Sequence, residues 1–322
     1  MSVYLVTGGA GFIGSHIVEE LLRRGERVRV LDNFFTGKRE NLDFSLLINR
    51  SIAQSLEIIE GDIRDLKKVE EVIKDVDYVI HVAALRSVPK SMDDPVSYHE
   101  VNVTGTLNIL LAAREEKIKK VVFASSSSVY GETKRLPEKE KLPPQPISPY
   151  ALTKLTGEYY CKVFSKAYGL KTVSLRYFNV FGPRQSLESQ YAVVIPKFIT
   201  CMLKNEPPPI HGDGLQSRDF TYVANVVKAT IQAATVPNLD GEVLNVACGE
   251  AYTVLDIVKY VNQILGKNIQ PIYNPPRPGD VKHTLADISL MQKKLGSGSN
   301  VNFLEGLKRT IEYFKKTIRE VE

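Results

Sequence analysis

The first half of the chain alternates short apolar runs with longer segments of helical periodicity. The apolar runs, rich in Val, Ile and Leu, cover residues 3–7, 27–31, 56–60, 78–82, 121–125 and 172–176. The helical patterns lie between them, near residues 13–24, 66–74, 95–116 and 150–168. Apolar strands separated by helices are typical of a parallel sheet that is covered on both faces. Since crossovers between parallel strands are nearly always right-handed, we expect an α/β fold with a doubly wound parallel sheet of the Rossmann type.

The second half of the chain has a more broken pattern, because prolines divide it into short pieces after about residue 176. A helix near 222–235 and a strand at 242–246 still fit the α/β pattern. A last helix, over 303–319, carries an apolar face made of Phe303, Leu307, Ile311 and Phe314. We therefore expect a first domain over residues 1–178, to which segments near 220–248 return, and a smaller region over residues 179–322.

The composition narrows the class of protein. Hydrophobic residues make up 43% and charged residues 25% of the 322 residues, as in ordinary globular proteins. The net charge of +5 comes from 42 basic and 37 acidic residues mixed along the chain, which argues against a nucleic-acid partner. No run approaches the ~20 apolar residues of a membrane helix. The 3 scattered cysteines argue against a disulfide framework or a zinc site, so we expect a cytoplasmic protein without a metal.

A glycine-rich turn follows the first predicted strand and opens the first predicted helix. Gly8 and Gly11 allow a tight turn close to a pyrophosphate, and Gly14 allows the helix to pack closely on the strand. The start of the helix adds free N–H groups that favour phosphate. Asp32 ends the second strand, and its carboxylate suits the ribose hydroxyls of NAD and repels the 2′-phosphate of NADP. The alternative, a sharp turn without a ligand, is disfavoured because strand, turn, helix and acid occur together.

Two Tyr-x-x-x-Lys pairs occur, Tyr130 with Lys134 and Tyr150 with Lys154. The spacing does not choose between them, but the first pair lies in an expected loop. The second follows a serine and a proline at 148–149, which are typical of a helix cap and a first helical turn. On that helix the two side chains share a face. A lysine cation close to a phenol lowers the pKa of the phenol, so we expect Tyr150 to act as a general base for a sugar or alcohol hydroxyl.

Four consecutive serines, Ser125 to Ser128, lie at the carboxyl end of the fifth predicted strand. Open α/β sheets bind their ligands at this end. A serine hydroxyl there can hold a substrate oxygen and relay its proton. For at least two of the four serines, a hydrogen-bonded turn is the expected role.

Together these residues resemble the extended short-chain dehydrogenase/reductase family, and within it the nucleotide-sugar 4-epimerases, over nearly the whole chain. The resemblance is carried by residues 7–14 (TGGAGFIG), 81–84 (HVAA), 102–106 (NVTGT), 125–131 (SSSSVYG), 148–154 (SPYALTK), 176–183 (RYFNVFGP), 212–214 (GDG), 217–220 (SRDF) and 277–280 (RPGD). Residues 194–198 (VIPKF) and 282–287 (KHTLAD) are most similar to the bacterial branch that acts on UDP-N-acetylhexosamines. The order and spacing of these motifs are highly specific for the family.

The resemblance implies a role for each matching residue. Tyr150 is the base, Lys154 holds the nicotinamide ribose, and Ser126 contacts the sugar's 4-hydroxyl, with Ser127 as the nearest alternative. Asp62 meets the adenine, although a plain turn is an equally good interpretation. The residues implied in NAD binding are Gly8, Gly11, Phe12, Ile13, Gly14, Asp32, Asn33, Gly37, Asp62, Ile63, Ala83, Ala84, Asn102, Tyr150, Lys154 and Tyr177. Those implied in UDP-sugar binding are Arg86, Ser87, Ser126, Ser127, Asn179, Val194, Arg218, Arg277, Asp280 and Thr284.

The implied activity is NAD-dependent inversion at C4 of a UDP-hexose through a 4-keto intermediate, on UDP-GlcNAc and UDP-GalNAc, on UDP-Glc and UDP-Gal, or on both pairs. Related 4,6-dehydratases have Asp and Glu where this chain has Ser127 and Ser128, which argues against water elimination. Thr284 leaves room for an acetamido group, where some glucose-only relatives have a tyrosine.

Three other functions stay open. A UDP-glucuronate epimerase or decarboxylase is one, because such relatives can have an arginine at the position of Arg86, although a second arginine of their pattern is replaced by Ser186. A nucleotide-sugar reductase and an NAD-binding protein without turnover are the others, and a poised base argues against the last. The resemblance also implies a homodimer, in which helices 95–116 and 150–168 pair with those of a second copy.

Overall fold

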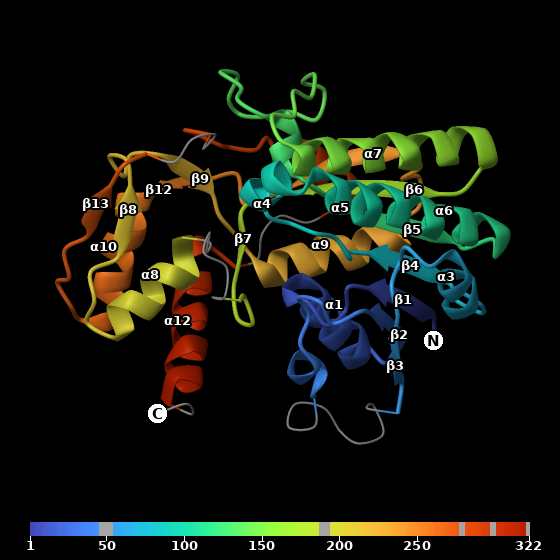
Figure 1. Ribbon diagram of the computed structural model, residues 1–322, viewed down its shortest axis with the longest axis horizontal. Coiled ribbons are helices and arrows are strands. Elements are labelled where there is room, and N and C mark those ends of the chain that lie inside the picture. The colour runs from blue at the N-terminus through green and yellow to red at the C-terminus, as the bar shows by residue number, and fades with distance from the viewer. Residues whose placement is uncertain (45–53, 187–193, 277–280, 297–300, 320–322) are drawn as a thin grey trace.

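The computed structural model describes residues 1–44, 54–186, 194–276, 281–296 and 301–319. Most of these residues surround a seven-stranded sheet in which neighbouring strands are parallel (Figure 1). In spatial order the strands are β11 (Glu242–Val246), β6 (Thr172–Tyr177), β5 (Lys120–Ser126), β4 (Tyr78–His81), β1 (Val3–Thr7), β2 (Arg27–Asp32) and β3 (Leu56–Glu60). The predicted doubly wound parallel sheet is confirmed, and each of its strands lies within one residue of the predicted bounds.

The strand order reverses between β1 and β4, which is where a doubly wound sheet opens a crevice for a ligand. Thr7 at the end of β1 is paired in register with His81 at the end of β4. The glycine-rich turn that follows Thr7 and the loop that follows His81 therefore lie side by side at the carboxyl edge of the sheet.

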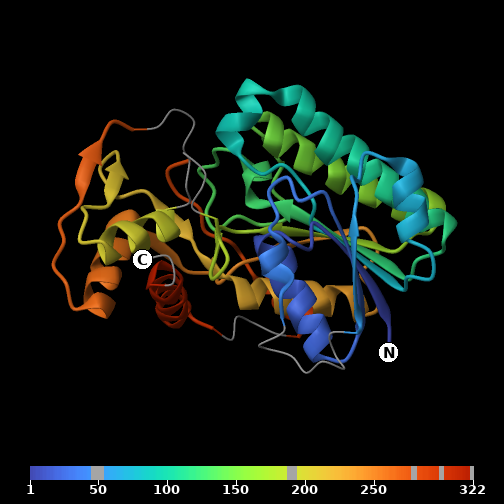
Figure 2. The same ribbon diagram turned by 60° about the horizontal axis from the view of Figure 1, so that its bottom comes forward.

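Helices cover both faces of the sheet (Figures 1 and 2). One face carries α1 (Phe12–Arg23) and α9 (Val223–Thr235), and the other carries α3 (Leu66–Val72), α6 (Gly105–Glu115) and α7 (Pro149–Tyr168). In β1, Tyr4 and Val6 belong to the core on the first face, and Leu5 belongs to the core on the second. Because both faces are buried, β1, β4 and β5 have apolar residues at most positions, which explains their apolar runs.

The helix predicted over 95–116 is confirmed as a continuous helical run over residues 95–115, which contains one π turn and so divides into three segments. These are α5 (Pro95–His99), a π-helical turn η2 (Glu100–Thr104) and α6; the short α4 (Val88–Asp93) precedes them. Next to the π turn, the Thr106 hydroxyl donates to the carbonyl oxygen of Asn102 at 2.6 Å. A single π turn depends on hydrogen bonds such as this one and has no residue signature of its own, so the sequence pattern does not reveal it.

Beyond β6 the chain builds a smaller region, seen at the left of Figure 1. Its strand pairs are β7 (Val180–Phe181) with β10 (Thr221–Tyr222), β9 (Ser217–Asp219) with β12 (Ala251–Thr253), and β8 (Pro209–His211) with β13 (Ile272–Asn274). Its helices are α8 (Val194–Leu203), α10 (Val254–Leu265) and α12 (Phe303–Arg319), whereas α11 (Ser289–Leu295) packs against β11 and α9. The predicted last helix is confirmed as α12, with its four predicted apolar residues buried. The division into two domains stays a prediction.

The described residues provide neither a membrane-spanning helix nor a cluster of metal ligands. None of their helices combines the length and the apolar character that crossing a membrane requires. They contain no group of three or more His, Cys, Asp or Glu side chains placed to hold a metal ion.

Candidate active site

Helix α7 presents Tyr150 and Lys154 on one side. As the sequence predicts, Ser148 caps the helix, and its hydroxyl accepts the N–H of Ala151 at 3.2 Å. Lys154 is 4% exposed, and its Nζ donates to the carbonyl oxygen of Ala124 in β5 at 2.8 Å. Loss of water around the ammonium lowers the pKa of Lys154 to about 7. The Lys154 ammonium is thus fixed at the carboxyl end of β5, where the serine run begins.

The other Tyr-x-x-x-Lys pair does not share a helix face. A short 3₁₀ helix, η3 (Ser127–Tyr130), ends at Tyr130. The Tyr130 ring is buried, and its hydroxyl donates to Oδ1 of Asn245 at 2.7 Å. The Tyr130 phenol is therefore a structural donor in the core, as expected of a pair outside a helix.

The serine run divides into a structural part and a part that faces Tyr150. Ser125 is buried and donates to Oε1 of Glu158 at 2.5 Å. The Ser126 hydroxyl accepts the backbone N–H of Ser128 at 3.2 Å and its hydroxyl at 2.9 Å. The Ser126 hydroxyl also lies near the phenol of Tyr150 and lowers its pKa. Between the two serines considered for the sugar's 4-hydroxyl, this contact favours Ser126, and the choice stays a prediction.

The pKa of Tyr150 differs from the expectation. It is raised, chiefly by removal of the phenol from water, while the Ser126 hydrogen bond and the positive charge of Arg86 lower it. The lowering expected from Lys154 is outweighed by this burial, and the Lys154 ammonium donates to the carbonyl oxygen of Ala124. The base thus rests in its protonated form until further positive charge reaches the site.

The glycine-rich turn fits a dinucleotide. Gly8 has φ +70°, and a Cβ there would lie 2.7 Å from the backbone of Ala83. A Cβ on Gly14 would lie 2.1 Å from the carbonyl oxygen of Gly8. Gly11 is the N-cap of α1 and has no side chain that could cap the helix, so the N–H groups of Phe12 and the residues after it face outward from its first turn. A phosphate is the usual partner of such a turn.

The acid at the end of β2 also suits NAD. The two carboxylate oxygens of Asp32, which is 7% exposed, accept the backbone N–H groups of Ala10 at 2.9 Å and Phe34 at 2.8 Å. Burial raises the pKa of Asp32, and these two hydrogen bonds oppose that rise. Each oxygen keeps a lone pair that a ribose hydroxyl can use. A Cβ on Gly37 would lie 3.0 Å from Oδ1 of Asp32, so Gly37 keeps space beside the carboxylate.

Asn33, Asp62 and Ile63, all predicted to bind NAD, come together where β2 and β3 end. Nδ2 of Asn33 donates to Oδ2 of Asp62 at 2.9 Å. Arg64 pairs with the same carboxylate at 2.8 Å, and this pairing lowers the pKa of Asp62 to about 2. Ile63 is buried against Gly105, where a Cβ would lie 2.5 Å from it. Asp62 is thus held as a carboxylate, and its contact with adenine stays a prediction.

The loop after β4 brings further predicted residues to the same edge. Ala83 faces Gly8, and Ala84 follows it in the loop. Asn102, 2% exposed, accepts the N–H of Leu85 at 2.8 Å through Oδ1. Its Nδ2 donates to the carbonyl oxygen of Leu85 at 2.9 Å and to the Thr153 hydroxyl at 3.0 Å. Both amide hydrogens of Asn102 are used within the protein, so this side chain fixes the loop, and a contact with NAD through it stays a prediction.

Two residues that hold Tyr150 escaped the sequence analysis. The Ser91 hydroxyl accepts the backbone N–H of Tyr150 at 3.1 Å. The ring of Tyr98 meets the ring of Tyr150 edge to face, with centroids 6.5 Å apart, and its hydroxyl accepts the N–H of Ser87 at 3.0 Å. Neither residue belongs to a recognisable motif, and only the folded arrangement of α4 and α5 against α7 brings them here. Ser87, predicted to bind substrate, caps α4 by accepting the N–H of Lys90 at 3.3 Å.

Tyr177, predicted to contact NAD, lies at the end of β6. Its hydroxyl is bonded to Oγ1 of Thr230 in α9 at 2.8 Å, and burial raises the pKa of its phenol. The hydroxyl is therefore occupied by α9, and a cofactor contact through the ring stays a prediction.

Several residues predicted to bind the nucleotide sugar meet between β9 and the chain near residue 284. Nδ2 of Asn179 donates to Oγ1 of Thr284 at 3.2 Å, and Oγ1 of Thr284 accepts the N–H of Asp219 at 3.4 Å. Nη1 of Arg218 donates to the carbonyl oxygens of Ser217 at 2.9 Å and Lys282 at 3.0 Å. Val194 is the first residue of α8. Arg277 and Asp280 lie outside the described residues.

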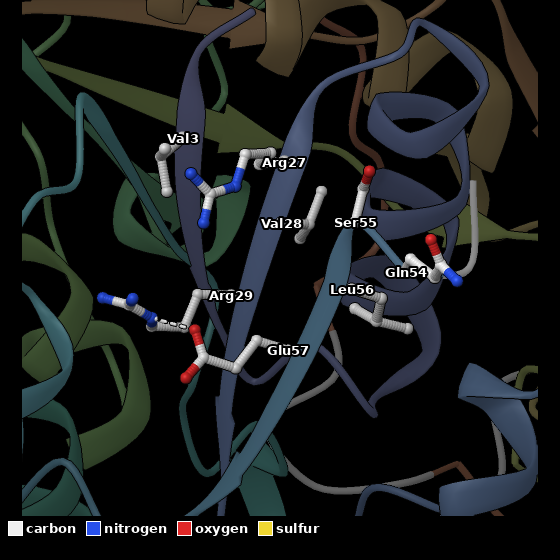
Figure 3. Close-up of a pocket in the computed structure, with 8 residues that line it drawn as sticks. All are labelled: Val3, Arg27, Val28, Arg29, Gln54, Ser55, Leu56 and Glu57. Atoms are coloured by element: carbon white, nitrogen blue, oxygen red, sulfur yellow. Dashed lines mark hydrogen bonds and ion pairs between the residues drawn. The ribbon is translucent and has the colours of Figure 1, made fainter. Parts of the chain in front are cut away.

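Figure 3 shows a small hollow at the opposite end of the sheet, where β1, β2 and β3 begin. Nε of Arg29 and Oε2 of Glu57 form an ion pair at 2.6 Å there. The residues that line the hollow are Val3, Arg27, Val28, Arg29, Gln54, Ser55, Leu56 and Glu57. Because ligands of parallel sheets bind at the carboxyl ends of the strands, this hollow is not part of the candidate site.

Known proteins resemble the whole chain. The NAD dependent epimerase/dehydratase family matches residues 4–247. A UDP-N-acetylglucosamine 4-epimerase from Methanobrevibacter ruminantium, solved with UDP-N-acetylmuramic acid, is 44% identical; the match covers 98% of this chain and 99% of that one, with a TM-score of 0.92. A UDP-glucose 4-epimerase from Thermotoga maritima, solved with UDP-glucose, is 39% identical over 98% and 99%, with a TM-score of 0.91. A UDP-glucuronic acid 4-epimerase from Bacillus cereus, solved with UDP-glucuronic acid and NAD, is 36% identical over 98% and 99%, with a TM-score of 0.89.

Proposed function

The chain belongs to the NAD-dependent epimerase/dehydratase family, and from this premise we propose that it is a UDP-sugar 4-epimerase, an isomerase that inverts C4 of a UDP-hexose. The observation that carries the proposal is the proximity of Tyr150 and Ser126 at the carboxyl end of β5, with Lys154 one helical turn from Tyr150. The pair lies on the ligand side of a sheet whose glycine-rich turn fits a dinucleotide.

NAD would be held by the glycine-rich turn, by the Asp32 carboxylate and by the Lys154 ammonium. When bound, NAD supplies a hydride acceptor that can return the hydride, so the net redox change is zero. Within the described residues, one N–H of the Lys154 ammonium donates to the carbonyl oxygen of Ala124, and its other N–H groups can donate to ribose hydroxyls. The positive charge that a bound oxidised nicotinamide brings also favours the Tyr150 phenolate.

The chain's own part in the reaction is proton transfer. Tyr150 takes the proton of the 4-hydroxyl as C4 is oxidised, and returns it when the 4-keto group is reduced again. Ser126 lies beside the phenol and can hold the same substrate oxygen during both transfers. Ser127 remains the alternative for this role. Inversion results when the keto sugar presents its opposite face before reduction.

For the keto sugar to rotate in the site, the protein must bind the UDP part tightly and the hexose weakly. Arg218 suits a pyrophosphate oxygen, because a guanidinium donates in fork geometry. Asn179 and Thr284, joined to each other and to the backbone of residue 219, line the same strand end. Arg277 and Asp280, outside the described residues, complete the predicted set.

The N-acetylated sugars UDP-GlcNAc and UDP-GalNAc are the substrates that we favour. The 44% identical relative acts on UDP-N-acetylglucosamine, and Thr284 is small enough to leave room for an acetamido group. UDP-glucuronate is the second candidate. The charge of Arg86 reaches the Tyr150 phenol, so it also reaches a substrate carboxylate close to the reacting carbon.

A substrate panel tests the proposal. The purified protein, with no added cofactor, is incubated with UDP-Glc, UDP-Gal, UDP-GlcNAc, UDP-GalNAc and UDP-glucuronate, and the products are separated by chromatography. We expect interconversion of UDP-GlcNAc and UDP-GalNAc, sustained by NAD retained from expression. Turnover only with added reduced cofactor would indicate a reductase, release of carbon dioxide from UDP-glucuronate a decarboxylase, and no product with any sugar a binding protein.

A further inference from the structure

A buried histidine lies between the glycine-rich turn and the helix that precedes the catalytic one. His81, at the end of β4, is 1% exposed. Its Nδ1 lies 2.7 Å from Oγ1 of Thr7, the residue before Gly8, and its Nε2 lies 3.0 Å from Oγ1 of Thr106 in α6. Neither the proton transfer nor the predicted cofactor contacts make use of this side chain.

The direction of each hydrogen bond follows from the number of hydrogens available. A threonine hydroxyl has one hydrogen. Thr106 gives its hydrogen to the carbonyl oxygen of Asn102 at 2.6 Å, so toward His81 it can only accept. Nε2 must therefore carry the imidazole hydrogen. Burial, helped by the positive charge of Lys154, lowers the pKa of His81 to about 3, so the ring is neutral and Nδ1 accepts the hydrogen of Thr7.

The same chain of hydrogen bonds continues to both sides. At one end, Oγ1 of Thr7 accepts the backbone N–H of Ala83 at 3.3 Å, next to the place where Gly8 leaves no space for a side chain. At the other end, the Asn102 amide donates to Thr153, and the Thr153 hydroxyl donates to the carbonyl oxygen of Tyr150 at 2.8 Å. The side chains that form this chain of hydrogen bonds are all buried: Thr7, His81, Asn102, Thr106 and Thr153. The π turn contains Asn102, whose carbonyl oxygen accepts the Thr106 hydroxyl and whose side-chain amide makes the next hydrogen bond.

We propose that His81 is a positioning residue, locked as its Nε2–H tautomer, which holds the glycine-rich turn in register with the backbone of Tyr150 through Thr106, Asn102 and Thr153. The inference rests on the proposed function, since it assigns a role in aligning bound NAD with the base. A ring that is neutral and has only one possible tautomer makes a bond of fixed length and direction to each side, and a buried network of this kind is rigid.

The tautomer is tested directly by long-range ¹H–¹⁵N spectroscopy of the histidine side chains in the protein as purified. Resonances are assigned by replacing His16, His99, His211 and His283 with glutamine, one at a time. We expect one ring with a protonated Nε2 and an unprotonated Nδ1, unchanged between pH 6 and pH 8. A charged ring or an Nδ1–H tautomer for His81 would overturn the proposal. This measurement needs no substrate or turnover, so its outcome is independent of whether the epimerase activity is found.

A pair of variants tests the positioning role. Thr106→Val keeps the β-branched shape and removes the hydroxyl between His81 and Asn102. Thr310→Val is the matched control, because the buried Thr310 hydroxyl makes the same bond to a carbonyl four residues earlier, at 2.7 Å, in the distant α12. We expect Thr106→Val to weaken NAD binding about fivefold, the effect of one buried hydrogen bond, and Thr310→Val to leave it unchanged. Equal NAD affinity in the two variants would overturn the positioning role.

Discussion

Glu138 is a carboxylic acid that the fold holds away from water. It is 1% exposed, and no hydrogen-bond partner is present for its Oε2 among the residues described. Its backbone joins the chain near residue 286, since its N–H donates to the carbonyl oxygen of Leu285 and its carbonyl accepts the N–H of Asp287. Burial and the negative charge of Asp219 raise the pKa of Glu138 to about 8, against the opposing charges of Arg176 and Arg218. The acid is therefore mostly protonated at pH 7.

This raised pKa makes stability depend on pH. The unfolded chain releases the Glu138 proton near pH 4.5, whereas the folded chain holds it to about pH 8, so the natural protein loses stability as the pH rises through this window. Glu138→Gln has no proton to lose. We expect the free energy of unfolding of the variant, relative to the natural chain, to rise by at least ~1.4 kcal/mol from pH 5 to pH 8.5, the equivalent of one pKa unit.

The measurement is urea unfolding at both pH values, with Glu312→Gln as the control because Glu312 is exposed on α12. An equal difference between Glu138→Gln and the natural protein at pH 5 and pH 8.5 would contradict the raised pKa.

At the scale of single residues, the sequence was a good guide where one short segment determines the environment. Ser148 and its proline predict the cap of α7, and the structure has it. The pKa of Tyr150 could not be predicted in the same way. It depends on burial by α4 and α5, on Ser126 from β5 and on Arg86 from the loop after β4, and no local pattern encodes those distances.

At the scale of elements, α5 and α7 share an apolar surface that faces outward. Leu152, Tyr159 and Val163 recur at helical spacing on α7, and Val96 lies on α5; each is more than half exposed. A surface patch of large apolar side chains on adjacent helices is typical of an interface between proteins. The homodimer implied by the sequence has this surface available, and we propose it as the site of dimerisation.

A charge placed in this surface tests the dimer. We expect the natural chain to sediment as a dimer and Val163→Lys to sediment as a monomer, because the interface would bury an unpaired ammonium. Ile272→Lys, at a similarly exposed apolar position on the distant β13, should remain a dimer. A natural chain that is monomeric, or a Val163→Lys protein that is still dimeric in analytical ultracentrifugation, would refute this interface.

The elements also show where periodicity stops being informative. Strands β1, β4 and β5 of the seven-stranded sheet could be placed from apolar runs alone, because burial on both faces imposes such runs. The π turn at Glu100–Thr104 could not, since it is set by hydrogen bonds of Asn102 and Thr106 with distant strands and helices.

At the scale of the whole molecule, the candidate site lies where the sheet's strand order reverses, and the smaller region supplies its other side. The Asp219 carboxylate accepts the backbone N–H groups of Cys248 and Gly249, both at 3.0 Å, and of Ala286 at 3.3 Å. It thus joins its own strand β9, which also carries Arg218, to the segments at residues 248–249 and at residue 286. The sequence predicts the members of this site through motifs, but not that Asp219 assembles them. The partners of Asp219 are backbone N–H groups, which every residue except proline has, so no sequence motif marks them.

The proposed epimerase reaction depends most on Tyr150, the base that exchanges a proton with the sugar's 4-hydroxyl. The decisive measurement is kcat, together with the Kd for the UDP-sugar, in Tyr150→Phe, with Tyr168→Phe on the exposed end of α7 as the control. We predict a fall in kcat of at least about 100-fold, the usual contribution of a general base, with UDP-sugar affinity nearly unchanged in Tyr150→Phe. A Tyr150→Phe enzyme that turns over at a rate close to that of the control would contradict the account.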